Sequence, residues 1–512
     1  MSQSPYSGPA LRASIAQFLS GKAASALLTF VLLLWLVRLL PVRDYGAYVT
    51  FVAALELGAL IANLGLPWLA ARYLPEYRLH AIGRRLQAFT WWIVCCLAAV
   101  QLAWALLLAL ALDPLLELVG LAAYREVAVL YLGVLVAEGV ARQLRDDVLG
   151  PLMQQKSARA ALVVRQAAML LLIAGWAFGT GVNLRDVVLA ELAASIVGLL
   201  IALIGLARCL AGMRSLPGST AWQEPPRAQM LATAGPMYGV CLLAMLHGPQ
   251  LFLMIIQRVL GPEAAAAFGF MRNLYEQALR YLPASLLVGL VRPKLIAAYV
   301  AGGGAEAVAR NANLAGKLSL FVLMPLISFA AVFGESLIGL LSGGKFPATG
   351  HVFFGFLLVL IPLSQRSLME AVAVTTGHSA LCMRAAVSGL LMLPLMYGLL
   401  LLGGGIWSAV VAMIVGQVLF DAIVLRGLFT RTGYAPDLLG LTRMLISASA
   451  AGLVTELMAF ALPVQVAGWC RLLLGGAVST LAFLIFARLM RPFSATERGR
   501  LNGFFGKQVF VW

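Results

Sequence analysis

The stretch Ala23-Ala-Ser-Ala-Leu-Leu-Thr-Phe-Val-Leu-Leu-Leu-Trp-Leu36 contains only two polar side chains, Ser25 and Thr29. A helix needs roughly 20 apolar residues to cross the hydrocarbon core of a membrane, and such blocks recur along the whole chain. Hydrophobic residues make up 62% of the 512 residues and charged residues only 11%, which is too little charge to coat a soluble protein. The blocks lack two-residue alternation, so they predict spanning helices and not a β-barrel.

The apolar blocks predict an all-α, polytopic transmembrane bundle of about 14 helices. The predicted spans cover residues 15–40, 45–69, 88–112, 126–152, 160–180, 187–208, 231–258, 264–290, 314–341, 350–376, 385–402, 406–426, 441–462 and 471–490. The first block is too long for the apolar region of a signal peptide, so we expect a retained first helix.

Basic residues are concentrated in every second connection of this predicted topology. Arg84, Arg159, Arg227 and Arg310 lie in the basic connections, whereas the alternate connections carry few Lys or Arg. Because cytoplasmic loops are enriched in Lys and Arg, we expect the inner (cytoplasmic) membrane as the location and both termini in the cytoplasm. The same loops account for the net charge of +16, so nucleic acid is not an expected partner.

Two segments outside the spans predict contact with the membrane surface. Residues 72–85 are amphipathic and basic, and we expect a loop there beside anionic headgroups. Residues 498–512 contain Phe504, Phe505, Phe510 and Trp512, which predict anchoring at the membrane interface.

Residues 209–230 form the longest polar break in the middle of the chain, and they include Pro217, Pro225 and Pro226. An internal repeat supports a division there. Arg38-Leu-Leu-Pro-Val-Arg-Asp-Tyr-Gly-Ala-Tyr48 aligns with Arg258-Val-Leu-Gly-Pro-Glu-Ala-Ala-Ala-Ala-Phe268 at an offset of 220 residues. We therefore predict a six-helix half (1–208), a cytoplasmic linker (209–230), a second six-helix half (231–430), two additional helices (431–490) and a cytoplasmic tail (491–512).

The eighth predicted span carries the clearest polar pattern. Arg272, Glu276 and Arg280 are spaced i, i+4, i+8, with Asn273 and Gln277 beside them, so they form one stripe on a helix. The stripe is either a cavity wall that presents cations to an anionic substrate or a self-paired ladder between helices. Two arginines against one glutamate leave positive charge over, which favours the cavity wall.

The fourth span carries a second cluster, Glu138, Arg142, Arg145, Asp146 and Asp147. We expect Glu138, Arg142 and Asp146 on one face with Arg145 offset from it. A near-neutral cluster at a helix end is either part of a binding site or an interfacial anchor.

Other spans carry pairs or single charges. In the tenth span Gln365 precedes Arg366, which forms an i, i+4 pair with Glu370, and the two can satisfy each other. Single charges in other spans are Lys22, Glu56, Glu191, Asp421 and Glu456. Charges inside a bilayer are costly and usually functional, so Glu56, Glu138, Glu276, Glu370 and Lys22 are candidates for charge pairing or ion coupling.

Several catalytic signatures are missing from the sequence. No Gly-x-x-x-x-Gly-Lys-Ser/Thr nucleotide loop, no Gly-x-Ser-x-Gly elbow and no His-Glu-x-x-His motif occurs. The six cysteines have no metal or redox spacing. We therefore expect no enzyme activity, no cofactor and no metal site.

Four stretches carry a family resemblance: residues 38–48, Asn63-Leu-Gly-Leu66, Arg72-Tyr-Leu-Pro-Glu76 and Leu260-Gly-Pro-Glu263. They resemble the polysaccharide transporter (Wzx-type flippase) family of the MOP/MATE-like superfamily, which the chain also matches in length and in its two-half organisation. The resemblance implies two six-helix bundles around a cationic central cavity, with alternating access. In the second half Ala266 occupies the position of Gly46 in the first half, so the second half matches the motif only weakly.

The substrate implied by the resemblance is an undecaprenyl-diphosphate-linked oligosaccharide for exopolysaccharide, O-antigen or capsule biosynthesis. Implied partners are membrane lipids, a polysaccharide polymerase and a chain-length regulator. Family members bind the diphosphate with basic residues at variable positions. Our candidate ligands come from helical pattern alone: Arg272, Arg280, Arg142, Arg145, Arg366, Asn273 and Gln277.

Three other functions stay open. A multidrug or cation antiporter of the same superfamily would use acids such as Glu56, Glu276 and Asp421 in its cavity. A membrane polysaccharide polymerase or glycosyltransferase would need a polar catalytic loop outside the membrane, and the sequence has none. A membrane assembly scaffold would pair all of its buried charges.

Overall fold

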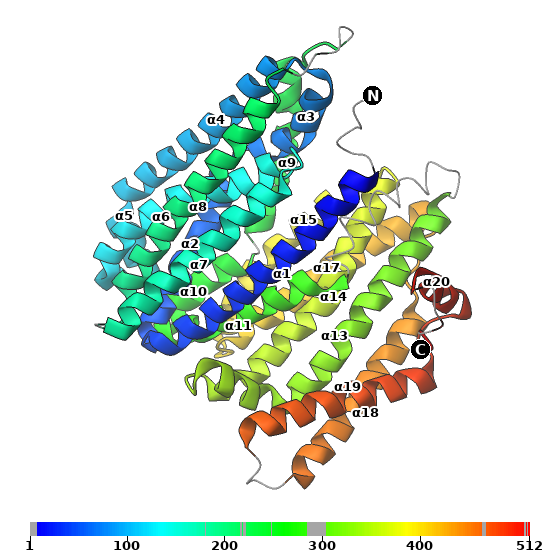
Figure 1. Ribbon diagram of the computed structural model, residues 1–512. Helices are drawn as coiled ribbons and strands as arrows, with labels where there is room; N and C mark the ends of the chain where they lie inside the picture. Colours follow the sequence, from blue (N-terminus) through cyan, green and yellow to red (C-terminus); the bar gives the residue numbers. More distant parts are fainter. Residues whose placement is uncertain are drawn as a thin grey trace. The chain divides into compact units, whose positions relative to one another are not determined.

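The chain is a polytopic helical membrane protein, shown as a computed structural model in Figure 1. The structure describes residues 8–179, 181–215, 218, 222–246, 248–283, 304–462, 467–505, 508 and 510–512, with most side chains from residue 24 onward. Within these ranges every regular element is helical. The chain divides into two compact units, Met1–Ala266 and Ala267–Trp512.

The first unit contains the elements α1 (Gly8–Leu39), α2 (Val42–Ile61), α3 (Leu66–His80), α4 (Gly83–Leu110), α5 (Leu112–Val119), η1 (Ala122–Tyr124), α6 (Arg125–Gln143), the π-helical turn η2 (Leu144–Leu149), α7 (Gln155–Gly179), α8 (Leu184–Gly212), α9 (Arg227–Met245), α10 (Pro249–Leu260) and the start of α11 (Pro262–Tyr281). Helix α8 starts with a capping box, in which Asn183 and Asp186 each accept the other's backbone N–H.

The second unit contains the rest of α11, α13 (Gly304–Ser342), η4 (Pro347–Thr349), α14 (Gly350–Thr375), α15 (Ala380–Ser388), η5 (Gly389–Leu391), α16 (Met392–Leu401), α17 (Trp407–Thr432), α18 (Leu438–Ala461), α19 (Gly468–Met490) and α20 (Ala495–Phe505). The long helix α13 packs against α14, α18 and α19.

Twelve helical segments among the described residues are long and apolar enough to cross a membrane. The apolar part of α1, Ala24–Leu39, is shorter, and α11 is not among the twelve. Large apolar side chains point outward on these helices; Phe178 is 91% exposed and Phe460 is 93% exposed. Such an apolar exterior suits a lipid solvent, in which helices satisfy their own backbone groups.

The second predicted span, 45–69, is wrong at its C-terminal end. Helix α2 ends at Ile61, and the chain turns at Gly65, whose φ is +77°, before α3 begins. A positive φ suits glycine, and Pro67 lies in the first turn of α3, where a missing N–H costs nothing. The loop predicted at 72–85 is also wrong, because α3 is a helix that buries Tyr73 and Tyr77.

The boundary between the two compact units follows Ala266, and the predicted linker 209–230 lies within the first unit. Helix α8 continues to Gly212 and α9 starts at Arg227, and parts of the segment between them lie outside the described residues. Helix α9 packs on α2 and α3, and α10 packs on α2 and α5, so both helices belong to the first unit. The division into repeated six-helix halves stays a prediction.

Two turns that the predicted repeat aligns are in contact within the first unit. Arg43 Nε donates to Glu263 Oε1 over 2.6 Å, and these positions are 220 residues apart. This hydrogen bond holds the pKa of Glu263 below its ordinary value. Beside it, a Cβ atom on Gly46 would lie 2.1 Å from the carbonyl oxygen of Pro262. The two backbones therefore approach so closely that position 46 has no room for a side chain.

Gly46→Ala is expected to destabilise the protein by about 1–3 kcal/mol, because the added methyl group overlaps a backbone oxygen that cannot rotate away. The midpoint of thermal unfolding in detergent, followed by tryptophan fluorescence, measures the effect. Gly175→Ala is the matched control, since a Cβ there meets nothing within 4 Å and alanine favours helix. Equal midpoints for the two variants would contradict the close approach.

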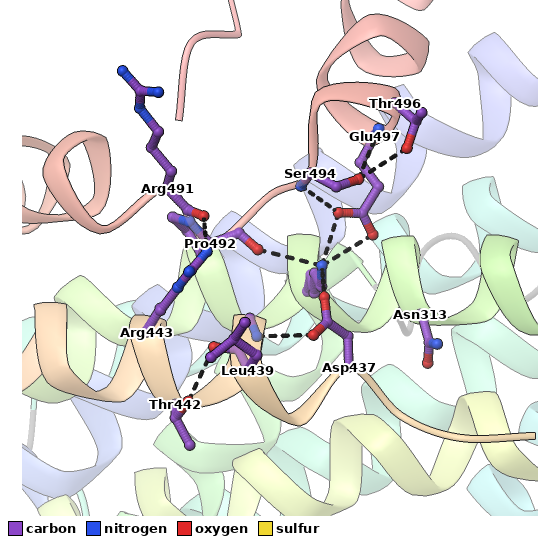
Figure 2. Close-up of polar contacts among 12 residues, drawn as sticks. Asn313, Asp437, Leu439, Thr442, Arg443, Arg491, Pro492, Ser494, Thr496 and Glu497 are labelled. Atoms are coloured by element: carbon purple, nitrogen blue, oxygen red, sulfur yellow. Dashed lines mark hydrogen bonds and ion pairs between the residues drawn. The ribbon is translucent and has the colours of Figure 1, made fainter.

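The C-terminal segment is docked on α13 and α18 of the second unit, as Figure 2 shows. Lys317 on α13 is 2% exposed; its Nζ donates to Glu497 Oε2 over 2.7 Å and to the Pro492 carbonyl over 3.3 Å, and it pairs with Asp437. Glu497 Oε2 accepts the Ser494 N–H over 2.8 Å, and Ser494 Oγ accepts the Glu497 N–H over 3.3 Å. This capping box starts α20 and presents its carboxylate to the lysine.

Aromatic rings strengthen this docking. The Phe321 ring on α13 lies 5.3–5.6 Å, centroid to centroid, from four other rings, Phe483, Phe493, Phe510 and Trp512. Phe510 is buried, and Trp512 Nε1 donates to the Leu484 carbonyl over 3.0 Å. The predicted membrane anchoring is therefore wrong for Phe510 and Trp512, which pack on the protein. The side chains of Phe504 and Phe505 lie outside the described part of the chain.

Candidate functional site

The arginines and the glutamate of the polar stripe form an ion-pair ladder along α11, as in the self-paired alternative, and the cavity wall that the charge count favours stays a prediction. Arg272 Nη2 lies 2.7 Å from Glu276 Oε1, and Arg280 Nη2 lies 3.5 Å from Glu276 Oε2. The i, i+4 spacing places each arginine one turn from the glutamate. One carboxylate thus lies between two guanidinium groups, and the ladder carries one unit of positive charge in excess.

The two arginines of the ladder have different surroundings. The Arg272 side chain is 3% exposed and the Arg280 side chain is 52% exposed. Asn273 and Gln277 are half-buried on the same helix, next to the ladder. The ladder therefore runs from the interior of the second unit to its surface, with amide groups beside it.

Helix α14 adds a third arginine near the ladder. The Tyr275 ring on α11 packs on Phe356 of α14, with the ring centroids 5.4 Å apart. The Tyr275 phenol lies within electrostatic range of both Arg272 and Arg366. The structure therefore brings two of the arginines predicted from sequence into one region of the second unit.

Arg366 is held by groups from α14 and α17. Its Nε donates to Glu370 Oε1 over 2.8 Å and its Nη1 donates to Gln417 Oε1 over 3.4 Å. The guanidinium carbon lies 3.9 Å from the centroid of the Phe420 ring, a cation–π contact. Asp421, one residue further on, interacts electrostatically with Arg366 and Glu370. This cluster contains one cation and two acids.

The sequence predicts the Arg366–Glu370 pair but not Gln417 or Phe420, and it identifies Asp421 only as a single acid in a span. Gln417 and Asp421 are spaced i, i+4, so one face of α17 carries both. That spacing was a usable signal. The contact with α14, however, comes from tertiary packing and is invisible in the spacing.

The first unit contains a buried network of four charges. Glu138 Oε1 lies 2.7 Å from Arg145 Nη2, and Glu138 Oε2 lies 2.7 Å from Arg165 Nε. Arg165 Nη2 lies 3.0 Å from Glu191 Oε1 and its Nε is 3.2 Å from Ser195 Oγ. The four charged side chains are 5–13% exposed. Two arginines and two glutamates make this network neutral.

The predicted arrangement of the fourth span is wrong in one respect. Arg145, expected to be offset, is the partner of Glu138, whereas Arg142 and Asp146 are exposed. Residues seven apart return to nearly the same face of a helix after two turns, and the long arginine side chain bridges the rise. Arg145 also lies in η2, where the backbone is π-helical. The seven-residue spacing between Glu138 and Arg145 is the signal in the sequence for this pair.

Arg165 joins the two glutamates of this network and is not among the residues predicted from the sequence. It lies in the predicted fifth span, where a single arginine is itself a signal of a polar partner. Glu191 was named only as a single acid. Because the two residues belong to α7 and α8, their pairing depends on packing between helices.

The remaining predicted residues are dispersed. Glu56 is half-buried and its Oε2 accepts a hydrogen bond from Gln250 Nε2 over 3.0 Å. Lys22 belongs to α1, but its side chain lies outside the described part of the structure. Within the described ranges, no group of three His, Cys, Asp or Glu side chains is placed to hold a metal ion.

Three solved structures have a similar fold. The lipid II flippase MurJ, in an inward closed conformation, superimposes with a TM-score of 0.67 at 11% identity, over 92% of this chain and 98% of MurJ. An inward-facing multidrug resistance MATE family transporter of the MOP superfamily has a TM-score of 0.62 at 15% identity, over 80% and 94% of the two chains. The Vibrio cholerae MATE transporter VcmN has a TM-score of 0.52 at 17% identity, over 83% and 99%.

No protein-family profile and no curated protein matches the sequence. The similarity is thus one of fold, over almost the whole length of each transporter. The chain has the fold shared by the lipid II flippase MurJ and the multidrug MATE transporters of the MOP superfamily.

Proposed function

We propose that this protein is a flippase for undecaprenyl-diphosphate-linked oligosaccharides, which it moves across the inner membrane for surface polysaccharide biosynthesis. The observation that carries the proposal is the pair of arginines on α11, Arg272 and Arg280, which lie one turn to either side of Glu276 and both contact its carboxylate. The MurJ-like fold supports it, because MurJ is a lipid flippase. A polysaccharide polymerase and a chain-length regulator are the partners we expect downstream.

The chemistry of the substrate fits the ladder on α11. A diphosphate is the most costly part of a lipid-linked sugar to move through hydrocarbon, and guanidinium groups bind phosphate oxygens in a bidentate manner. Glu276 holds both arginines in place before the substrate arrives, which reduces the entropy lost on binding. Asn273 and Gln277 offer amide donors and acceptors to sugar hydroxyl groups.

The other predicted ligands are weaker candidates. Arg145 is buried against Glu138, and Arg366 is held by Glu370. Arg145 and Arg366 each have a carboxylate partner, whereas Arg272 and Arg280 share one carboxylate and lie together on one helix, which suits the two phosphates of a diphosphate better. We therefore assign the main role to Arg272 and Arg280, and a secondary role to the exposed Arg142.

A multidrug or cation exporter is the second candidate function. The cluster on α14 and α17 favours it, since Glu370 and Asp421 outnumber Arg366 there. A cationic substrate or a coupling cation would be attracted to such a site. Similar structures include MATE multidrug transporters.

The double variant Arg272→Gln, Arg280→Gln is expected to move a fluorescent polyprenyl-diphosphate disaccharide across proteoliposome membranes at least about tenfold more slowly than wild type. The reason is that each charge-assisted hydrogen bond to the diphosphate contributes about 1.5–3 kcal/mol. Quenching of the outer-leaflet fluorophore over time measures the rate. Arg426→Gln with Arg431→Gln, two exposed residues of α17, is the control for the same change of charge. Gel filtration shows whether each variant is folded.

Two results would contradict the flippase assignment. The first is a wild-type protein that moves the labelled lipid no faster than empty vesicles. The second is an unchanged rate in the folded double variant. Transport of a fluorescent organic cation by the same vesicles, lost in Asp421→Asn, would support the exporter.

A further inference from the structure

A basic pocket lies where α19 ends and the docked C-terminal residues return to it. Its volume is about 420 Å³, and its lining residues are Ile485, Arg488, Leu489, Arg491, Arg498 and Val511. Three of the six are arginines and none is acidic. The pocket is separate from the ladder on α11 and from the cluster around Arg366.

The arginines of the pocket are not neutralised by the ion network beside it. Glu497, the acid next to Arg498, pairs with Lys317, and no ion pair among the described residues joins an acid to Arg488, Arg491 or Arg498. Figure 2 shows the Arg491 side chain directed away from Glu497 and Asp437.

The backbone at Arg491 explains this direction. Its φ is +49°, the left-handed conformation that ends α19, and Pro492 follows, which cannot continue a helix. Its carbonyl oxygen accepts a hydrogen bond from Arg443 Nη1 over 3.1 Å, which fixes the turn. The side chain is thereby directed into the pocket with Arg488.

The other side of the pocket is apolar and open. Ile485 is 61% exposed and Leu489 is 68% exposed, and both lie on α19, a candidate membrane span. The arginines begin in the last turn of that span. A ligand that fills the pocket therefore meets aliphatic side chains on the membrane side and guanidinium groups beyond them.

We propose that this pocket binds the headgroup of an anionic phospholipid of the surrounding membrane. Its phosphate accepts hydrogen bonds from Arg488, Arg491 and Arg498, and its acyl chain lies along Ile485 and Leu489. A free phosphate would use only the arginines and would leave the apolar wall uncovered. A zwitterionic lipid would bring its own ammonium group close to three guanidinium groups, so it binds less well.

The pocket exists because the C-terminal segment is docked. Arg498 belongs to α20, whose first turn is held by the Glu497–Lys317 contact. Arg498 Nη1 lies 3.5 Å from the carbonyl oxygen of Val511, so both sides of the returning segment line the pocket. The bound lipid would join α19 to this segment.

Native mass spectrometry of the purified full-length protein, with equal amounts of phosphatidylglycerol and phosphatidylcholine, tests the proposal. We expect one tightly bound phosphatidylglycerol in the wild type. A triple variant should weaken this binding by at least about tenfold, because each basic residue is attracted to an anionic lipid surface. It carries Arg488→Gln, Arg491→Gln and Arg498→Gln. The control is a triple variant with the same change of charge at three exposed arginines of the same unit, Arg384→Gln, Arg426→Gln and Arg431→Gln.

Three results would overturn the proposal. The first is equal binding of phosphatidylglycerol and phosphatidylcholine, and the second is an equal loss of phosphatidylglycerol binding in the test and control variants. The third is displacement of the lipid by millimolar inorganic phosphate, which would indicate a site for free phosphate. Glu497→Gln tests the dependence on docking: it leaves all three arginines in place and should still weaken binding. Failure here leaves the flippase assignment intact, since α11 is unchanged.

Discussion

Arg165→Met is expected to lower the free energy of unfolding by about 3–5 kcal/mol, the usual result of removing one partner from a buried ion network. In the variant, Glu138 keeps Arg145 as its partner. Glu191 loses Arg165, the cation that pairs with it in the network of described residues. Glu191 is 7% exposed, so water cannot replace the lost guanidinium group. The methionine fills a similar volume, which keeps a cavity from adding to the loss.

The midpoint of thermal unfolding in detergent measures this change, and two further variants isolate its cause. Arg185→Met removes an exposed arginine at the start of α8 and should leave the midpoint nearly unchanged. Arg165→Met with Glu191→Gln removes one cation and one acid together, so it should recover at least half of the lost stability. A double variant as unstable as the single one would show that packing of Arg165, and not charge, holds the helices.

The two units therefore use intramembrane charge in different ways. The network around Arg165 is neutral and buried, which suits a role in joining α6, α7 and α8. The ladder on α11 contains two arginines and one glutamate and reaches the surface of its unit at Arg280. We infer that the buried arginines of the first unit determine its packing, whereas a role of the α11 arginines in substrate binding stays part of the proposed function.

Hydropathy predicted most of the fold, because a membrane span must consist of apolar residues over a nearly fixed length. Each of the fourteen predicted spans overlaps at least one helix among the described residues, but α11 is not a candidate membrane span, and residues 284–290 of the eighth predicted span lie outside the described part of the chain. Errors arose where the chain breaks within an apolar block. Gly65 ends the turn before α3, and Gly248 with Pro249 separates α9 from α10, so glycine and proline were the available signals.

The charged clusters were predictable only where both partners lie on one helix. The Arg272–Glu276–Arg280 ladder and the Arg366–Glu370 pair follow from i, i+4 spacing, and Glu138–Arg145 follows from two full turns. Partners on different helices could not be assigned, because hydropathy and spacing contain no information about which faces meet. Lys317 is absent from the predicted single charges, although a lysine inside the predicted ninth span is itself a signal of a polar partner.

Lys317→Met is the second substitution for which we expect a large effect, about 3 kcal/mol of lost stability in the C-terminal segment. The variant removes the cation that Glu497 and Asp437 share, and it removes the donor to Pro492. Limited proteolysis with trypsin should then cleave at Arg498 and Arg500 before the rest of the chain is cut. Lys156→Met, at an exposed lysine of α7, is the control and should not change the cleavage pattern.

The pH dependence of this effect identifies its origin. Burial acts to raise the pKa of Asp437, but hydrogen bonds from Lys317 and from the Gly440 N–H outweigh it and hold the pKa below its ordinary value. A carboxyl group with a lowered pKa stabilises the folded state above its unfolded pKa of about 3.9, and this stabilisation is lost as the pH falls through the folded value. The difference between wild type and Lys317→Met should therefore be constant from pH 8 to about 5 and shrink below about 4. A difference that stays constant below pH 4 would assign the lost stability to the packing of Lys317 and its hydrogen bond to the Pro492 carbonyl, and not to its pairing with the carboxylates.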